Sequence, residues 1–356
     1  MIKLPNLDAL RFVLATLVLL YHVPQLCKNQ GLPFFDGLPI FHRGVEAVYM
    51  FFCLSGFLII RLIYLAKQRG AFSMRNFYMR RILRIFPLYY LVLIFGFLFY
   101  HWIVPQLGIS FETNYNLTEG LLLTVFFLPN VFAELYDPGG ILAVLWSIGI
   151  EEQFYLFIAP MLLFIKPGRI LSVLIGIAVL YFVVFHLPFT ELLREYFFVY
   201  FFLLFGGITA LLEEKGHLQF LKSHPAIPLA IGIITLLFFV TDLFVFEILW
   251  VRNGITVVVF CLFLHALAYN NFEITVRNRF VNYLGKISYG LYMYHVIALN
   301  FVVFIFLKLK DYENFTDEIT IVLINITTFV LTVAMAHLSY RYFERFFLKL
   351  KTNYRK

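Results

Sequence analysis

The sequence predicts an all-α membrane protein that crosses the bilayer about ten times and keeps both termini in the cytoplasm. Of its 356 residues, 62% are apolar and only 14% are charged, whereas a soluble domain is about 45–50% apolar and about 25% charged. Long apolar segments recur along nearly the whole chain. Such a chain cannot cover a water-facing surface with polar side chains, which excludes a disordered protein, a disulfide scaffold and a soluble enzyme with one anchor.

Ten segments qualify as spans, because a transmembrane helix needs about 20 largely apolar residues. They cover approximately residues 8–27, 45–65, 86–104, 145–165, 169–188, 196–212, 226–243, 251–270, 287–308 and 318–340. A shorter apolar run at 121–132 is expected to be interfacial or re-entrant. The first segment resembles a signal peptide, but Arg11 interrupts it and no small-residue cleavage site follows, so we expect it to remain as the first helix.

The basic residues orient these spans. Of the 28 Lys and Arg residues, 21 fall on the N-terminal side of the predicted membrane, six on the opposite side, and Arg11 inside the first span. The positive-inside rule then assigns both termini to the cytoplasm. This bias explains the net charge of +7 without a nucleic-acid partner. The basic C-terminal segment, residues 341–356, is expected to anchor at the anionic leaflet. We expect a membrane domain over residues 1–347 and a basic cytoplasmic tail over residues 348–356.

The cysteines and the common nucleotide motifs indicate no further chemistry. Cys27, Cys53 and Cys261 are far apart and form no C-x-x-C pair, so we expect neither a metal site nor a disulfide framework. No H-E-x-x-H motif, P-loop, dinucleotide fingerprint or G-x-S-x-G is present.

Charged side chains inside the spans are the first candidates for function, since an ionised group at the bilayer centre costs roughly 2.5–3.5 kcal/mol on insertion scales. The first span contains Asp8, Arg11 and His22. Eleven residues separate Arg11 from His22, which is about three helical turns, so both project from one face some 16 Å apart along the axis. The alternative is that Arg11 pairs with Asp8 at i−3 and extends to the cytoplasmic headgroups.

Two adjacent carboxylates, Glu151 and Glu152, enter the fourth span and are followed by Gln153. Adjacent helical residues point about 100° apart, so at most one glutamate can face His22. A carboxylate that orients an imidazole is the usual second half of a general-base arrangement. In the alternative interpretation, both glutamates form an acidic cap at the helix N-terminus.

A cytoplasmic run of arginines, Arg75, Arg80, Arg81 and Arg84, ends at Pro87. Arg81 and Arg84 lie one turn apart, and Arg80 and Arg84 are spaced i,i+4, so several guanidinium groups can converge on a phosphate. Positive-inside anchoring explains the same cluster without a ligand.

Three further features of the spans stand out. Ser55-Gly56 predicts a close helix-packing point in the second span. His295, in the ninth span, is a polar residue of the kind often satisfied within a core, and Glu344 follows the tenth span.

These motifs occur in the order typical of one family. Leu7-Asp-Ala-Leu-Arg11 with His22, Phe51-Phe-Cys-Leu-Ser-Gly-Phe-Leu-Ile59 and Arg81-x-x-Arg84-Ile-Phe-Pro87 resemble the opening of the acyltransferase type 3 family. Its later motifs are similar to Trp146-Ser-Ile-Gly-Ile-Glu-Glu-Gln-Phe-Tyr155, Ile287-Ser-Tyr-Gly-Leu-Tyr-Met-Tyr-His295 and Tyr340-Arg-Tyr-Phe-Glu344. The resemblance runs from about residue 6 to 347. Departures are Ala9 and Phe12, where the family often has glycine, and Arg345-Phe346, where it often has Arg-Pro.

The resemblance implies a ten-helix integral membrane acyltransferase that moves acetyl from acetyl-CoA to extracytoplasmic glycans such as lipopolysaccharide, capsule or peptidoglycan. It implies that Arg11 and His22 match the motif essential for transfer, that Arg81 and Arg84 serve acyl-CoA use, and that Glu151 and Glu152 form the acidic motif. No fused SGNH-type domain is expected.

We therefore expect a bacterial inner-membrane O-acetyltransferase whose partners are the lipid bilayer, acyl-CoA and a carbohydrate acceptor, with no metal. Catalysis is assigned to His22, Arg11, Glu151 and Glu152, and CoA binding to Arg80, Arg81 and Arg84. His22 acts either as general base or as acyl carrier. The alternative function is a transporter or flippase of a lipid-linked or small acidic substrate, although no paired helix interruptions indicate one.

Overall fold

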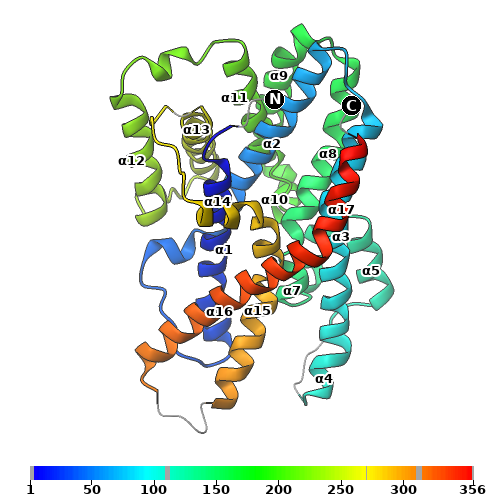
Figure 1. Cartoon of the computed structure of the whole chain (residues 1–356), viewed down its shortest axis with the longest axis vertical. Helices are drawn as coiled ribbons and strands as arrows, with labels where there is room; N and C mark the ends of the chain where they lie inside the picture. The colour runs from blue at the N-terminus through cyan, green and yellow to red at the C-terminus, as the bar shows by residue number, and fades with distance from the viewer. Residues whose placement is uncertain (1–3, 109–112, 270, 310–314, 355–356) are drawn as a thin grey trace. The chain divides into compact units, whose positions relative to one another are not determined.

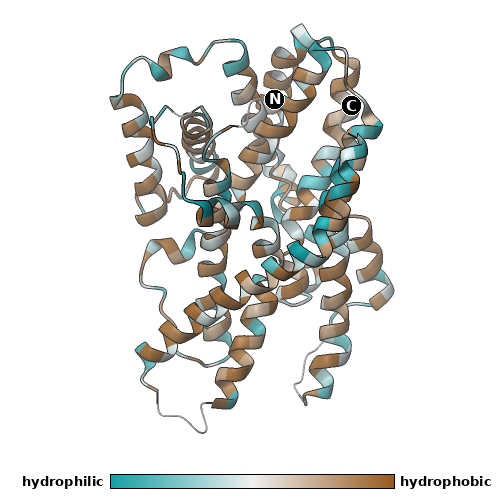
Figure 2. Cartoon of the chain, in the orientation of Figure 1, coloured by the Kyte–Doolittle hydropathy of each residue, from teal (hydrophilic) through white to brown (hydrophobic). Residues whose placement is uncertain are grey.

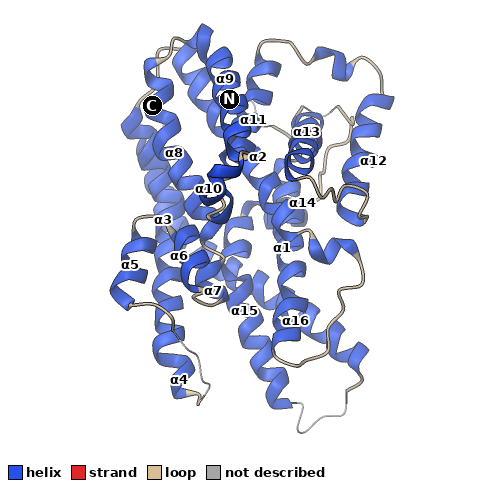
Figure 3. Cartoon of the chain, turned by 180° about the vertical axis from the view of Figure 1, so that it is seen from behind, coloured by secondary structure: helices blue, strands red, loops and turns tan. Residues whose placement is uncertain are grey.

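The computed structural model describes residues 4–108, 113–269, 271–309 and 315–354. Within these ranges every regular element is helical, which confirms the predicted all-α class (Figure 3). Lys3, which entered the charge balance, and residues 355–356 of the expected tail lie outside the described residues. The chain divides into two compact units, which are treated separately below.

The first unit comprises Met1–Arg61 and Phe202–Leu338. In it α1 packs against α14 and α15, and α12 packs against α13. Its helices, labelled in Figure 1, are α1 (Leu7–Asn29), most of α2 (Gly44–Gln68) and α11 (Tyr200–Glu214), α12 (Ala226–Val240), α13 (Leu249–Ala268), α14 (Arg279–Lys286), α15 (Ser288–Leu309) and nearly all of α16 (Asp317–Ser339).

The second unit comprises Leu62–Phe201 and Ser339–Lys356. Here the C-terminal helix α17 packs along α3, and α6 packs on α8. Its helices are α3 (Met74–Leu98), α4 (Val104–Gln106), α5 (Leu117–Val125), α6 (Pro129–Tyr136), α7 (Gly140–Ala143), α8 (Trp146–Phe164), α9 (Ile170–Phe185), α10 (Glu191–Glu195) and α17 (Arg345–Leu350), with a π-turn η6 (Tyr340–Glu344) and a terminal 3₁₀ turn η7 (Lys351–Tyr354).

Each of the ten predicted spans corresponds to a helix. By length and composition, eight helices of the described chain can cross a membrane, and a ninth if α10 and α11, which are bent by 84° at the break between them, form one span. The tenth, α12, is apolar but only 15 residues long. The hydrophobic colour runs along the long helices, as expected for lipid-facing surfaces (Figure 2); the protein is therefore a multi-pass membrane protein.

Helix α12 ends at Val240, a little before the predicted boundary near residue 243. The Arg43 guanidinium donates to the Thr241 carbonyl oxygen at 2.8 Å and to Asp242 Oδ1 at 2.8 Å. Arg43 is itself buried. These bonds hold the two residues after α12 in a non-helical path, which an apolar pattern cannot indicate.

The close packing predicted at Ser55-Gly56 is confirmed between α2 and α11. A Cβ on Gly56 would lie 1.8 Å from the Leu203 carbonyl oxygen, and one on Gly206 would lie 2.0 Å from the Cys53 carbonyl oxygen. Only glycine lets the two backbones approach this closely, as at small-residue interfaces between membrane helices.

Helix α3 begins at Met74, well before the predicted span near residue 86. Ser73 caps it by accepting a hydrogen bond from the Asn76 N–H at 3.3 Å, and Pro87 lies inside the helix. Neighbouring helices make an internal proline tolerable in a membrane protein. As a result, the arginine run and the third span share one continuous helix.

The apolar run at 121–132 forms no span. Most of its residues belong to two short helices, α5 and α6, of nine and eight residues. Phe127 between them has a φ of 60°, in the left-handed region. Since about 20 residues are needed to cross the bilayer, the prediction that this run is not an eleventh span is confirmed.

Candidate active site

In the first unit, α1 carries both Arg11 and His22 on one unbroken helix. Its N-terminal end is fixed by Gly285 of α14, where a Cβ would lie 1.8 Å from the Asp8 carbonyl oxygen. Arg11 Nη1 donates to Asp8 Oδ1 at 3.0 Å. The ion pair of the alternative interpretation is therefore present, and it holds the guanidinium at this end of the helix.

His22 lies among aromatic rings at the other end of α1. Its ring centroid is 5.0 Å from that of Tyr21 and 5.2 Å from that of His295, and its side chain hydrogen-bonds to Gln25. Because α1 packs on α15, two histidines that are far apart in the sequence meet here. The sequence indicated His295 only as a polar core residue.

In the second unit, Glu151 and Glu152 have different surroundings. Glu151 Oε2 accepts a hydrogen bond from the Tyr155 hydroxyl at 2.9 Å. Glu152 Oε1 is buried and has no hydrogen-bond partner among the described residues, while Arg81 acts on this carboxylate electrostatically. Both glutamates lie beyond the first turn of α8, which begins at Trp146, so the alternative of an acidic N-terminal cap is wrong.

Gln153, the polar residue next to the glutamates, is fully engaged. Its Nε2 donates to the Phe127 carbonyl oxygen at 2.6 Å and to Asn130 Oδ1 at 2.8 Å, and its Oε1 accepts from the Tyr200 hydroxyl at 2.5 Å. These bonds tie α8 to the α5–α6 connection and to the start of α11. Gln153 thus has a structural role that fixes the rotation of the helix carrying both glutamates.

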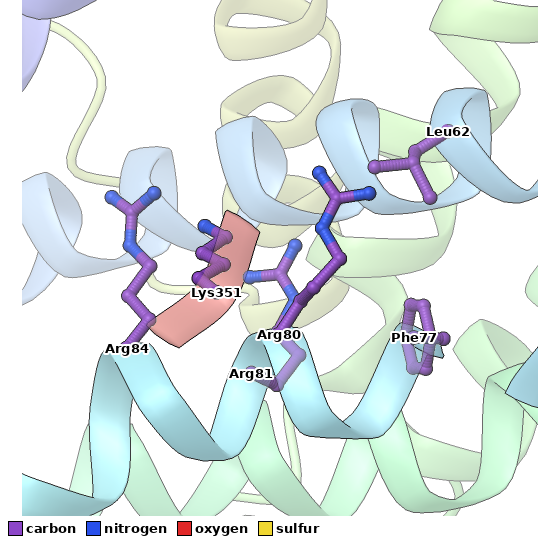
Figure 4. Close-up of a pocket in the computed structure, with 6 residues that line it drawn as sticks. All are labelled: Leu62, Phe77, Arg80, Arg81, Arg84 and Lys351. Carbon is purple, nitrogen blue, oxygen red and sulfur yellow. The ribbon is translucent and has the colours of Figure 1, made fainter. Parts of the chain in front are cut away.

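The predicted arginines come together in a pocket of the second unit. Its cavity measures about 330 Å³, including space open to solvent, and is lined by Leu62, Phe77, Arg80, Arg81, Arg84 and Lys351. Figure 4 shows the three arginines rising from α3 with Lys351 of η7 beside them. Four of the six lining residues are cations and none is a carboxylate, so the pocket is suited to a phosphorylated ligand. We call it the cation pocket.

The cation pocket is connected to the acidic motif through Tyr155. The Arg81 guanidinium carbon lies 4.8 Å from the centroid of the Tyr155 ring, and the hydroxyl of the same tyrosine bonds to Glu151. Arg84 acts electrostatically on Glu344, a buried residue of η6. The arginine cluster and the carboxylates therefore belong to one electrostatic network.

The carboxylate of Glu344 is also held locally. Its Oε1 accepts a hydrogen bond from the Ser339 hydroxyl at 3.2 Å, across the π-turn that ends α16. Glu344 thus faces the arginine cluster from a fixed position on the C-terminal segment.

The structure therefore groups the candidate residues into two sets. Arg11 and His22 lie in the first unit, whereas the cation pocket and the two glutamates lie in the second. An orienting contact between a glutamate and His22 stays a prediction. Sequence reasoning missed Lys351 and Tyr155, and gave His295 no role; the basic tail and the family-like motifs around Tyr155 and His295 were the only signals for them.

A resident metal site is not indicated in the part of the chain that is described. No three His, Cys, Asp or Glu side chains within it come together as metal ligands do. The cation pocket remains the place where an anionic cofactor or substrate could be held.

Comparison with known proteins identifies the family. The Acyltransferase domain family matches residues 4–340. The peptidoglycan O-acetyltransferase OatA of Listeria monocytogenes is 27% identical over 54% of this chain and 31% of its own length. A protein of Acidianus two-tailed virus, named as an acetyltransferase, is 28% identical over 82% of both chains.

A protein of Staphylococcus aureus strain COL, named as an O-acetyltransferase, is 24% identical over 97% of this chain and 57% of its own. The chain thus spans between about a third and somewhat over half of the length of these two bacterial relatives. The search of solved structures found no match. With nearly all of its length matched, this multi-pass membrane protein belongs to the Acyltransferase domain family.

Proposed function

We propose that the protein transfers an acetyl group from cytoplasmic acetyl-CoA to a hydroxyl of a surface or lipid-linked glycan, in the plasma membrane of a bacterium. The observation that carries this proposal is the cation pocket, with three guanidinium groups and one ammonium group around a single cavity. CoA bears a diphosphate and a 3′-phosphate, and clustered guanidinium groups bind such groups by charge-assisted, often bidentate hydrogen bonds.

The cation pocket binds the phosphates of acetyl-CoA, so the thioester at the other end of the donor is free to reach a second group. Arg80, Arg81 and Arg84 hold the nucleotide end of CoA, and the pantetheine arm presents the thioester to His22. Arg11 supports the donor from the same helix as His22. Fixing the reactants in this way supplies much of the acceleration expected of a group-transfer enzyme.

His22 carries out the transfer chemistry. As a general base it removes the proton of the acceptor hydroxyl while the hydroxyl oxygen attacks the acetyl carbon and the CoA thiolate leaves. As an acyl carrier it first takes the acetyl group on a ring nitrogen and then passes it to the hydroxyl. In both routes a carboxylate, Glu151 or Glu152, stabilises the charged imidazole.

The acceptor is proposed from the relatives. The Listeria protein is named for peptidoglycan and the Staphylococcus protein for O-acetyl transfer, so a glycan hydroxyl is the acceptor that agrees with both. The transporter alternative has no support from the family, whose members are named for acyl transfer.

The test uses membrane vesicles from a strain of the source organism that lacks this gene and is complemented with it. Vesicles with the wild-type chain should transfer label from radiolabelled acetyl-CoA into alkali-labile esters of their own glycan, and vesicles without the chain should not. Equal label in both would refute the proposal. Label in lipid or protein instead of glycan would support the acyltransferase activity but refute the proposed glycan acceptor.

A further inference from the structure

His295 is the most deeply buried polar group beside the proposed catalytic histidine. It is 1% exposed in α15, and its ring centroid lies 5.2 Å from that of His22, with 40° between the ring planes. Residues close to the two histidines along their helices, Leu19 and Val23 of α1 and Leu299 of α15, belong to one apolar core. The two histidines thus form a polar contact between helices α1 and α15, which also share an apolar core.

The position of the hydrogen on His295 follows from its contacts. Its Nδ1 is hydrogen-bonded to the Tyr292 carbonyl oxygen. A carbonyl oxygen can only accept, so Nδ1 carries the hydrogen, and in the neutral imidazole Nε2 then presents a lone pair. Nε2 is buried and has no hydrogen-bond partner among the described residues.

Another buried histidine of the same unit shows the usual arrangement. His265 is fully buried in α13, and both of its ring nitrogens have partners: Nε2 lies 2.8 Å from Glu213 Oε2, and Nδ1 lies 3.4 Å from Asn271 Nδ2. A buried acceptor left without a donor costs about 1–3 kcal/mol. His265 avoids this cost, whereas His295 bears it, which indicates that a ligand supplies the missing donor.

We propose that His295 Nε2 is the base that receives the proton of the acceptor hydroxyl, which deepens and rests on the function proposed above. A hydroxyl is a neutral donor of the kind that Nε2 lacks. As its oxygen bonds to the acetyl carbon, its proton moves to His295 Nε2. The acetyl carbon then loses its bond to the leaving group, which is the His22 nitrogen of the acyl-carrier route, in which His22 does not itself take the proton of the hydroxyl. The leaving group departs with the electron pair and finally takes up the proton.

Two substitutions separate the functions of the two nitrogens. His295→Asn keeps an amide N–H near the position of Nδ1, where it can donate to the Tyr292 carbonyl oxygen, but it removes Nε2. His295→Gln brings an amide oxygen near the position of Nε2, which can accept a hydrogen bond but not a proton. The matched control is His337→Asn in α16 of the same unit, because His337 pairs through Nδ1 with the Tyr283 hydroxyl at 2.8 Å.

The acetyl transfer rate is measured in the vesicles described above, and acetyl-CoA binding and thermal unfolding are measured on the purified variants. We expect His295→Gln to lower the rate roughly 10²-fold or more, as for loss of a general base. His295→Asn should lower it about tenfold further, because the hydrogen bond to the hydroxyl is also lost. His337→Asn should keep the wild-type rate, and all variants should bind acetyl-CoA as the wild type does.

Wild-type transfer by both His295 variants would overturn this inference and leave the proposed function intact. Loss of acetyl-CoA binding or of the folded state in both variants would also overturn it, because His295 would then be a packing residue. An inactive wild-type chain would instead defeat the proposed function, on which this assignment rests.

Discussion

Replacing Lys351 by alanine should weaken CoA binding by roughly five- to thirtyfold. Lys351 is one of four cations that line the cation pocket. Two unit charges 4 Å apart interact by about 4 kcal/mol at an effective dielectric of about 20. The pocket is open to solvent, and ordering a lysine side chain costs up to about 2 kcal/mol, so we expect a net loss of about 1–2 kcal/mol, which corresponds to that change in Kd. Three guanidinium groups remain, so binding persists.

The control for this experiment is Lys349→Ala. Lys349 is an exposed residue of α17, close to Lys351 in the chain, and its removal changes the net charge by the same amount. Equilibrium binding of CoA to the purified protein is measured at one fixed salt concentration, because charge interactions are screened by salt. If both substitutions weakened CoA binding equally, the effect would come from net charge alone, and the reasoning would be refuted. An unchanged Kd for Lys351→Ala would refute it as well.

Two further predictions concern single side chains. Tyr155→Phe removes the hydroxyl that bonds to Glu151 but keeps the ring beside Arg81. We therefore expect a lower acetyl transfer rate with unchanged CoA affinity. Tyr155→Leu removes the ring as well and should lower both the transfer rate and the CoA affinity. Gly56→Ala forces a methyl group against the Leu203 carbonyl oxygen and should lower stability by about 1–3 kcal/mol or more, seen as a lower thermal midpoint in detergent. Gly176→Ala, whose added Cβ meets nothing within 4 Å, is its control and should leave the midpoint unchanged or slightly raised; an equal midpoint for both would contradict the close packing.

The sequence was sufficient for the features that depend on local pattern. The apolar segments predicted the helices because burial of the backbone in lipid allows little else. The i,i+3 and i,i+4 spacing of the arginines indicated that their guanidinium groups can converge on one ligand, although membrane anchoring explained the same run, and Ser55-Gly56 predicted close packing. Each of these depends on residues within one helix.

The features that the sequence did not predict depend on contacts between distant segments. Lys351 reaches the cation pocket only because the tail packs along α3, and a basic tail is equally expected of a membrane anchor. His295 meets His22 only because α15 packs on α1. The early start of α3 depends on a single capping serine, Ser73, which a hydropathy pattern cannot reveal.

The central claim is that His22 transfers acetyl from acetyl-CoA to a glycan hydroxyl. The most direct test compares wild-type and His22→Ala chains, present at equal levels in the same vesicles, for transfer of label from radiolabelled acetyl-CoA into alkali-labile glycan esters. The account predicts transfer by the wild type and a loss of at least roughly 10²-fold in the variant. Equal transfer by the two chains would contradict it.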